Sequence, residues 1–315
     1  MTVSDAGGIA SAVDETAVVR RYSGSVGWPT VALCAGLVAA DALVVFGWAV
    51  GSLPLWLGCV LNTWISYAFY TVHHDANHKA ISGRAERWRW LDPVCGSIAA
   101  VPLQLSFRGF SSEHLRHHAH TNDPLRDPDA IVAGPFWQVP VKWFATIVIS
   151  LLYTLPRGER LVDRILERVL PDGFPEPTER IRLENRRLQR FFRLGTVALL
   201  ASIPLGWFLP VFFLWWLPGR LALLVLMALF QWLPHFPYES TERFLNTRIT
   251  TFRGSTWLLF QQDRHLIHHL YPSVPWYRYR AVYREVRPLL VQHHARIEGR
   301  DADAPRPILL RSEAP

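Results

Sequence analysis

Two long apolar blocks limit the folds open to this chain. The first covers residues 28–72 and is interrupted at 51–54, and the second covers 194–232 and is interrupted at 217–220. Each block therefore divides into two segments of about 20 residues, which at about 1.5 Å of rise per residue can cross a bilayer core. The pattern predicts an all-α integral membrane protein with four transmembrane helices in two hairpins.

The distribution of positive charge sets the expected orientation. The chain has 33 Lys and Arg against 26 Asp and Glu, a formal net charge of +7. If only the two hairpins cross the membrane, 31 of the 33 cations lie on the side of the N-terminus, and Arg220 lies on the far side. Cytoplasmic loops collect Lys and Arg in this way. Both termini are therefore expected in the cytoplasm, with membrane lipids rather than nucleic acid as the partner of this charge.

The remaining segments are assigned to a cytosolic helical cap and two tails. The apolar stretch 134–156 is expected to return to its own side as a re-entrant or interfacial helix, and 157–170 to lie along the headgroups. Residues 1–26 are expected to be a disordered cytosolic tail rather than a leader. The membrane domain is assigned to 27–290 and a C-terminal cytosolic tail to 291–315.

Three histidine clusters lie on one side of the membrane in this topology. Within each cluster the histidines are separated by three or four residues, or are adjacent: His74 and His78; His114, His117 and His118; His265, His268 and His269. Side chains three or four residues apart share one face of a helix. Imidazole suits iron, copper or zinc, and eight ligands are too many for one ion, so two metal ions are expected. A metal transporter, the remote alternative, would need its ligands at the midplane of broken helices.

The clusters and their order resemble the histidine boxes of the membrane fatty-acid desaturase superfamily, over residues 50–285. The sequences at 114–124 with 127–129, and at 265–272 with 275–277, resemble most closely the desaturase-type carotenoid ring hydroxylases. The resemblance implies a non-haem di-iron centre held by the eight histidines, with O2 as co-substrate. It also implies a ninth ligand before the last box, which His235 is placed to supply. His73 is an alternative to His74.

Carboxylates are expected to hold the ligand imidazoles, because a histidine that binds metal through one nitrogen donates the other N–H to an acceptor. Five aspartates are close enough to the boxes in sequence to serve: Asp75, Asp123, Asp127, Asp129 and Asp263. The Asp-Pro pairs at 123–124 and 127–128 also have a purely structural explanation as turns. His120 is expected beside the ligands rather than among them, and His293 and His294 at the surface.

These expectations define an oxidoreductase that acts on an apolar lipid. The resemblance favours hydroxylation of a carotenoid β-ring, and the alternative is a fatty-acyl desaturase or hydroxylase, which the sequence does not separate from it. The chemistry needs two external electrons, yet the chain has no G-x-G-x-x-G fingerprint and no His-Pro-Gly-Gly haem signature. A separate ferredoxin or cytochrome with its reductase is therefore expected, and the basic segment 157–193 could dock it or face lipid headgroups.

Overall fold

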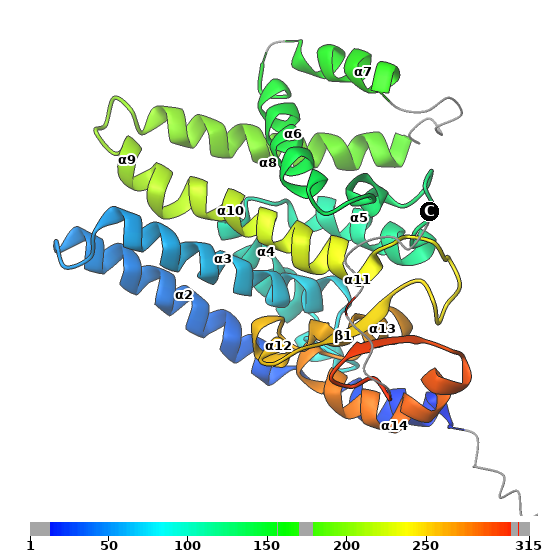
Figure 1. Cartoon of the computed structure of the whole chain (residues 1–315). Coiled ribbons are helices and arrows are strands. Elements are labelled where there is room, and N and C mark those ends of the chain that lie inside the picture. Colours follow the sequence, from blue (N-terminus) through cyan, green and yellow to red (C-terminus); the bar gives the residue numbers. More distant parts are fainter. Residues whose placement is uncertain (1–12, 156, 170–178, 304–307, 309–315) are drawn as a thin grey trace, which may run out of the picture.

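The computed structural model describes residues 13–155, 157–169, 179–303 and 308, and these residues are mostly helical (Figure 1). Two short strands, β1 (Arg248–Thr251) and β2 (Arg296–Gly299), pair in parallel with Arg248 opposite Arg296. The helices are α1 (Glu15–Tyr22), α2 (Trp28–Ala49), α3 (Leu55–Asn77), η1 (Glu86–Trp88), α4 (Leu91–Leu103), α5 (Phe107–His120), η2 (Pro128–Val132), α6 (Gln138–Leu152), α7 (Gly158–Val169), α8 (Glu179–Ala201), α9 (Phe208–Val211), η3 (Phe212–Trp216), α10 (Leu217–Leu226), η4 (Met227–Trp232), α11 (Leu233–His235), α12 (Ser255–Leu258), η5 (Gln262–Arg264), α13 (His265–Leu270), η6 (Trp276–Arg278) and α14 (Tyr279–Gln292).

The first predicted hairpin is present. Helices α2 and α3 lie side by side and antiparallel, joined by a tight turn at the predicted place (Figure 1). Gly51 has a φ of +76° in this turn, a conformation that costs glycine little, and Pro54 immediately precedes α3. Helix α3 therefore runs back toward the start of α2 and brings the first histidine box to that end of the bundle.

The predicted break in the second block at 217–220 is wrong. One helix runs from Phe208 to His235 and includes two π-helical segments, η3 and η4. Pro218 has no backbone N–H, so the carbonyl of Leu214, four residues earlier, loses its usual helical hydrogen-bond donor. The side-chain amide of Asn62 donates to that carbonyl instead, at 2.7 Å, so the helix continues through the proline. The turn lies at 202–207, where Gly206 has a φ of +74°.

The same correction moves Arg220 from the far side of the membrane into the interior of the bundle. Its side chain is 2% exposed, and Nη2 donates to Gln104 Oε1 at 2.7 Å. Gly219 beside it allows α4 to approach, because a Cβ there would lie 2.5 Å from the carbonyl oxygen of Pro102. Pro218, Gly219 and Arg220 thus form a contact between helices rather than a turn.

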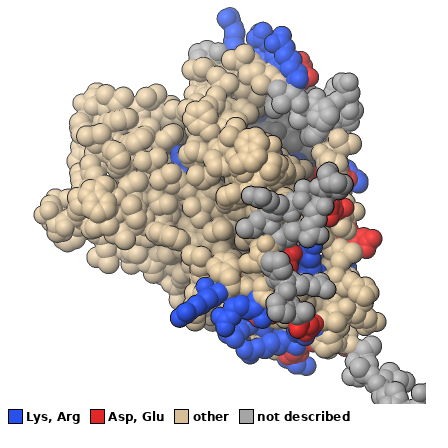
Figure 2. Space-filling view, in the orientation of Figure 1, with Lys and Arg blue, Asp and Glu red and all other residues tan. Residues whose placement is uncertain are grey.

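Two helices, Trp28–Ala49 and Phe208–His235, are long and apolar enough to cross a membrane by length and composition. Helices α3 and α8 have 23 residues each, with polar or charged residues at one end. Figure 2 shows the end of the bundle at the α2–α3 and α8–α9 turns almost without charge, whereas Lys, Arg, Asp and Glu gather over the other side. Large side chains such as Trp56 and Leu205 are exposed at the apolar end.

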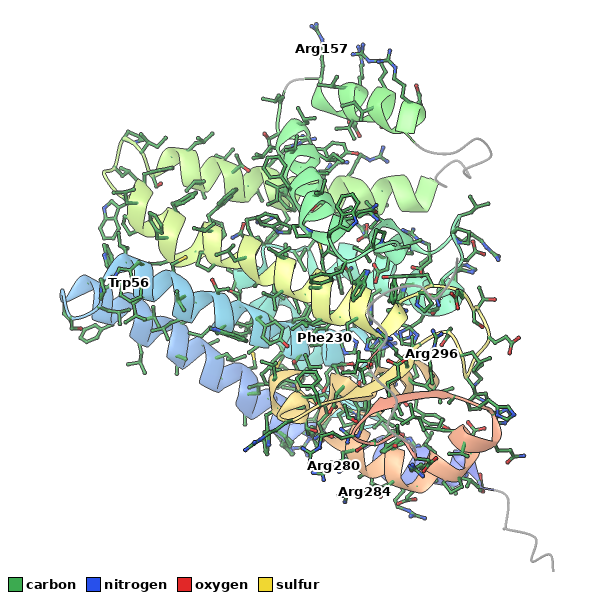
Figure 3. All side chains as sticks on the ribbon, viewed as in Figure 1. Trp56, Arg157, Phe230, Arg280, Arg284 and Arg296 are labelled. Atoms are coloured by element: carbon green, nitrogen blue, oxygen red, sulfur yellow. The ribbon has the colours of Figure 1, made fainter. Side chains whose placement is uncertain are left out.

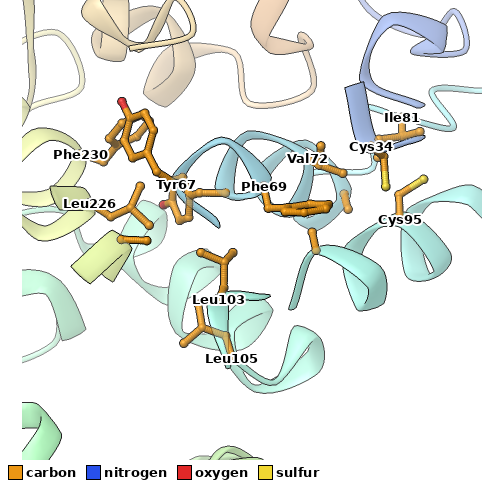
Figure 4. Close-up of a cluster of buried hydrophobic side chains, with 14 of the residues drawn as sticks. Cys34, Tyr67, Phe69, Val72, Ile81, Cys95, Leu103, Leu105, Leu226 and Phe230 are labelled. Atoms are coloured by element: carbon orange, nitrogen blue, oxygen red, sulfur yellow. The ribbon is translucent and has the colours of Figure 1, made fainter. Parts of the chain in front are cut away.

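The main core packs α3 against α4 and α10. Tyr67, Phe69, Leu103, Leu226 and Phe230 are among its buried members (Figure 4). The burial of these side chains fixes the second half of α3, where every residue from 66 to 77 is buried. The histidines of the first box therefore project from a rigid helix end.

Elements near the termini differ from the expected tails. Within 1–26, α1 forms a helix whose Val18 is buried against α14, and Tyr22 donates a hydrogen bond to Glu285. Within 291–315, β2 pairs with β1. The apolar and amphipathic helices expected within 134–156 and 157–170 are present as α6 and α7, although residues 156 and 170 lie outside the described part of the chain.

Candidate metal centre

The ends of four chain segments meet at the charged side of the bundle and bring nine histidines together. The segments are the last turn of α3 with its C-cap, helix α5, the short helix α11 and helix α13. The histidines are buried or half-buried: His74, His78, His114, His117, His118, His235, His265, His268 and His269. All eight box histidines and the expected ninth therefore lie at one place.

Five of these side chains form the first cluster, with ligand atoms within 4.8 Å of one another. His74 Nε2 and His118 Nε2 lie 3.0 Å and 2.7 Å from His268 Nε2. His114 Nε2 lies 2.8 Å from His78 Nε2 and 3.2 Å from His118 Nε2. Every box contributes to this cluster, so it forms only when α3, α5 and α13 are all in place.

The second cluster contains His117, His235 and His269, whose ligand atoms also lie within 4.8 Å of one another. His265 joins them, since its Nε2 lies 3.2 Å from His235 Nε2 and 3.1 Å from His269 Nε2. The adjacent residues His117 and His118, and likewise His268 and His269, belong to different clusters. The doubled histidine at the end of each of these boxes thus supplies one imidazole to each cluster.

The chemistry of the two clusters fits two metal ions. Burial, followed by repulsion from neighbouring imidazoles, holds the pKa of His114, His118 and His268 well below the usual value, so these rings are neutral. Where several unprotonated Nε2 atoms converge with no hydrogen-bond donor between them, their lone pairs face and repel one another. A cation among them removes that repulsion, and neutral imidazole nitrogen is the ligand that iron, copper and zinc accept.

Asp127 orients one of the candidate ligands. His117 Nδ1 donates to Asp127 Oδ1 at 2.8 Å, and Asp129 Oδ2 lies 3.7 Å from the same nitrogen. Burial alone would lower the pKa of His117, but the nearby Asp129 and Asp127 carboxylates outweigh it and raise that pKa. Asp127 is held by the backbone N–H groups of Asn122 and Asp129. This arrangement leaves Nε2 of His117 free to face the second cluster.

Three residues that the sequence analysis missed contact the outer nitrogen of other candidate ligands. The Gln262 carboxamide lies 3.0 Å from His265 Nδ1 and 3.4 Å from His74 Nδ1. Tyr279 OH lies 3.1 Å from His268 Nδ1, and Thr121 Oγ1 lies 3.3 Å from His269 Nδ1. Gln262 and Thr121 are three and four residues from a box histidine, which is a weak signal in sequence. Tyr279 is on another helix and has none.

The other three aspartates make their hydrogen bonds elsewhere. Each accepts from groups that are not histidines: Thr30 and the Trp276 backbone for Asp75; Leu125 and Arg126 for Asp123; Ser255, Thr256 and Arg264 for Asp263. Asp123 therefore closes a turn, in agreement with its structural explanation. The structure does not bring these three carboxylates to the candidate ligands.

The remaining histidines lie outside both clusters. His73 is fully buried, but its ring packs on Phe107 and Phe110 rather than facing His268 as His74 does. His120 is partly exposed at the end of α5. His293 is exposed and stacks on Phe244. Of the two spacings possible for the first box, the structure uses the one that starts at His74.

An apolar groove of about 860 Å³ runs beside the helix end that carries His235. It lies between the segment that leads into α6 and the C-terminal part of the long helix. Its lining residues are Gly134, Pro135, Phe136, Trp137, Ala228, Leu229, Trp232, Leu233, Phe236, Pro237 and Glu239. The wall is therefore aromatic and aliphatic, with one carboxylate and no cation among the residues that line it.

An apolar helical bundle with two histidine clusters at its polar end defines a candidate metalloenzyme that works at a membrane. Residues 47–300 match the family model described as fatty acid desaturase. The chain belongs to the fatty acid desaturase family, which confirms the predicted relationship, and it is an oxidoreductase.

Three relatives show the range of this similarity. The chain is 23% identical over 280 residues to an endoplasmic reticulum omega-6 fatty acid desaturase of Brassica juncea, covering 76% of this chain and 67% of the relative. It is 25% identical over 263 residues to a delta(12)-acyl-lipid-desaturase of Punica granatum, covering 75% and 65%. It is 25% identical over 226 residues to a beta-carotene ketolase of a Paracoccus species, covering 69% and 74%. Both acyl-lipid and carotenoid enzymes are thus similar to this chain.

Proposed function

We propose that this chain is an O2-dependent di-iron hydroxylase of a carotenoid β-ring. The observation that carries the proposal is the pair of converging histidine clusters, of five and four imidazoles, beside an apolar groove. The nine imidazoles would hold two ferrous ions, and such an all-nitrogen site would supply the reduction of O2 to an oxidant able to remove hydrogen from an unactivated C–H bond. The protein fixes nine imidazoles, orients His117 through Asp127, and provides an apolar groove beside the helix end that carries His235.

The groove favours a neutral hydrocarbon with a rigid, flat part. Phe136, Trp137, Trp232 and Phe236 present aromatic faces or edges to it, and such rings pack well on a conjugated polyene. The residues that line it include no Lys or Arg, so the phosphates of an acyl-CoA would find no partner there. The similarity to a protein described as a beta-carotene ketolase supports the same substrate class.

A fatty-acyl desaturase or hydroxylase is the second candidate. It is favoured by the Brassica and Punica relatives, which are described as acyl desaturases. Hydroxylation and desaturation share the removal of the first hydrogen and differ in the second step, which either returns oxygen to the carbon or removes another hydrogen. A flexible acyl chain of a membrane lipid also fits an apolar groove, so only the products separate the two candidates.

We further propose that four helices cross the membrane, namely α2, α3, α8 and the helix from Phe208 to His235. The apolar end of the bundle in Figure 2 would then lie in the lipid, and the histidine clusters would lie at the cytosolic face with both termini. In this arrangement the groove beside His235 opens near the membrane boundary, where an apolar substrate is available.

The test is expression of the full chain in a host that makes β-carotene. Pigments and fatty acids are both analysed by chromatography and mass spectrometry, with the His268→Ala variant as the inactive control. Mono- and dihydroxylated carotene in the wild type alone is the expected result. Unchanged pigments with a new acyl double bond or hydroxyl would replace the proposal by the second candidate.

Filling the groove should block the substrate without disturbing the metal centre. Ala228 lines the groove, so Ala228→Trp is expected to lower kcat/KM for the apolar substrate at least about tenfold while bound metal stays unchanged. Ala201→Trp, at an exposed position at the end of α8, is the matched control. Equal activity of the two variants in reconstituted membranes would show that substrate enters by another route.

A further inference from the structure

A stripe of arginines lines a concave surface on the outer side of α14. Arg280, Arg284 and Arg287 are spaced four and three residues apart and therefore share one face of the helix. With Arg264, Tyr283 and Asp301 they line a cavity of about 190 Å³. Arg280 and Arg284 project from α14 away from the bundle (Figure 3), at an edge where Lys and Arg gather in Figure 2.

The carboxylates at this surface pair with only some of its arginines, so the surface keeps a net positive charge. Arg264 pairs with Asp301 at 2.8 Å, and Arg287 pairs with Asp303 at 2.5 Å. Arg280 and Arg284 are exposed and form no ion pair within residues 13–155, 157–169 and 179–303. Two adjacent guanidinium groups beside a concavity therefore remain for an external anionic group.

One buried residue connects this surface to the first histidine cluster. Tyr279 immediately precedes Arg280, is fully buried, and holds its hydroxyl 3.1 Å from His268 Nδ1. Arg264 immediately precedes His265 in the same way. Two residues that line the cavity, Arg280 and Arg264, are thus adjacent in sequence to Tyr279 and His265, and one hydrogen bond joins Tyr279 of α14 to a candidate metal ligand.

We propose that this surface docks an acidic protein that carries one electron at a time and delivers it toward the metal centre through Tyr279 and His268. The inference rests on the proposed function, which consumes R–H, O2, two electrons and two protons and releases R–OH and water. Two molecules of the reduced carrier, docking in turn, are each oxidised by one electron. An acidic carrier complements the stripe in charge, which speeds its encounter and fixes its orientation.

Two features of the α14 stripe favour an acidic protein over lipid headgroups as its partner: the concavity and the buried Tyr279 next to it in sequence. Headgroup contacts need only exposed cations, and Arg160 and Arg164 on α7 are exposed as well. The α14 stripe adds a concavity and a buried tyrosine in contact with a candidate ligand. The arginines of α7 are therefore a matched control, with the same charge and the same spacing of four residues.

The experiment uses the full chain, loaded with iron and reconstituted in nanodiscs, and an acidic [2Fe–2S] ferredoxin as the probe. The variants are Arg280→Glu with Arg284→Glu, and Arg160→Glu with Arg164→Glu. Ferredoxin affinity is measured directly by calorimetry at low salt, and product formation is measured with ferredoxin and, separately, with dithionite. We expect the α14 variant alone to bind ferredoxin at least about tenfold more weakly and to show a raised KM for ferredoxin, with dithionite-driven turnover unchanged.

Equal ferredoxin affinity in the wild type and the α14 variant would overturn the docking proposal. So would equal weakening in the two variants, or an α14 variant that loses only its binding to vesicles containing anionic lipid. The proposed function fails separately, if the wild type forms no oxidised carotenoid or acyl product with dithionite. The direct binding measurement reports on the docking surface in that case as well.

Discussion

Replacement of His268 by alanine is expected to abolish product formation in the carotene-producing host. His268 Nε2 lies 3.0 Å and 2.7 Å from His74 and His118 in the first cluster, so the substitution removes a central ligand. We expect activity to fall at least about 100-fold, since even the outer partners of metal ligands contribute about 10- to 100-fold to affinity or activity. Bound iron, measured by plasma mass spectrometry, should fall from about two to about one ion per chain.

The control for this variant is His120→Ala. His120 follows the second box on α5 but is partly exposed and lies outside both clusters. We expect iron content and activity to match the wild type, and immunoblots to show similar amounts of all three proteins in the membrane. An active His268→Ala enzyme, or equal iron loss in the two variants, is incompatible with the clusters as described.

The second large effect is expected for Asp127→Asn. The Asp127 side chain is fully buried and accepts the Nδ1–H of His117, together with two backbone N–H groups. The amide keeps the shape but loses the charge that holds His117 in the orientation with Nε2 toward the second cluster. We expect about a 10- to 100-fold loss of activity, with partial loss of iron. Product yield and iron content are measured in the same membranes.

Asp123→Asn is the matched control, because Asp123 and Asp127 both precede proline in the same loop. Asp123 bonds to Leu125 and Arg126 and contacts no histidine among its described hydrogen bonds. Its replacement should affect at most the stability of a turn at the surface. If both asparagine variants lost iron equally, the loop as a whole, rather than the Asp127–His117 hydrogen bond, would be responsible.

The histidine clusters were predictable because ligand spacing is a local property of a helix. His114, His117 and His118 share a face of α5 wherever that helix lies, and the apolar segments place the boxes at one end of the bundle. Which acid meets which imidazole depends on contacts between distant segments. From the sequence alone, five aspartates are therefore equally good candidates to hold a ligand imidazole. The sequence also does not indicate that Tyr279, eleven residues after His268, contacts the His268 ring.

The position of the turn in the second hairpin could not be predicted for a different reason. Two proline-glycine signals lie close together, Pro204 with Gly206 and Pro218 with Gly219, and the turn forms at the first rather than at the second, where it was expected. A proline ends a helix because a carbonyl loses its donor, but here Asn62 of α3 supplies that donor. No feature of the sequence near Pro218 indicates that Asn62, more than 150 residues earlier, donates this hydrogen bond. The position of the turn between α8 and the long helix therefore depends on a contact between segments far apart in the sequence.

The origin of the candidate ligands has a consequence for the life of the protein in the cell. Each cluster draws imidazoles from segments that are more than 100 residues apart, so the binding free energy of the proposed metal ions would become available only when these segments have packed together. Ions that bind the native state alone stabilise it in proportion to the logarithm of their free concentration. Under the proposed di-iron assignment, iron supply should therefore control how much of this protein survives quality control in the cell, in addition to how fast it works.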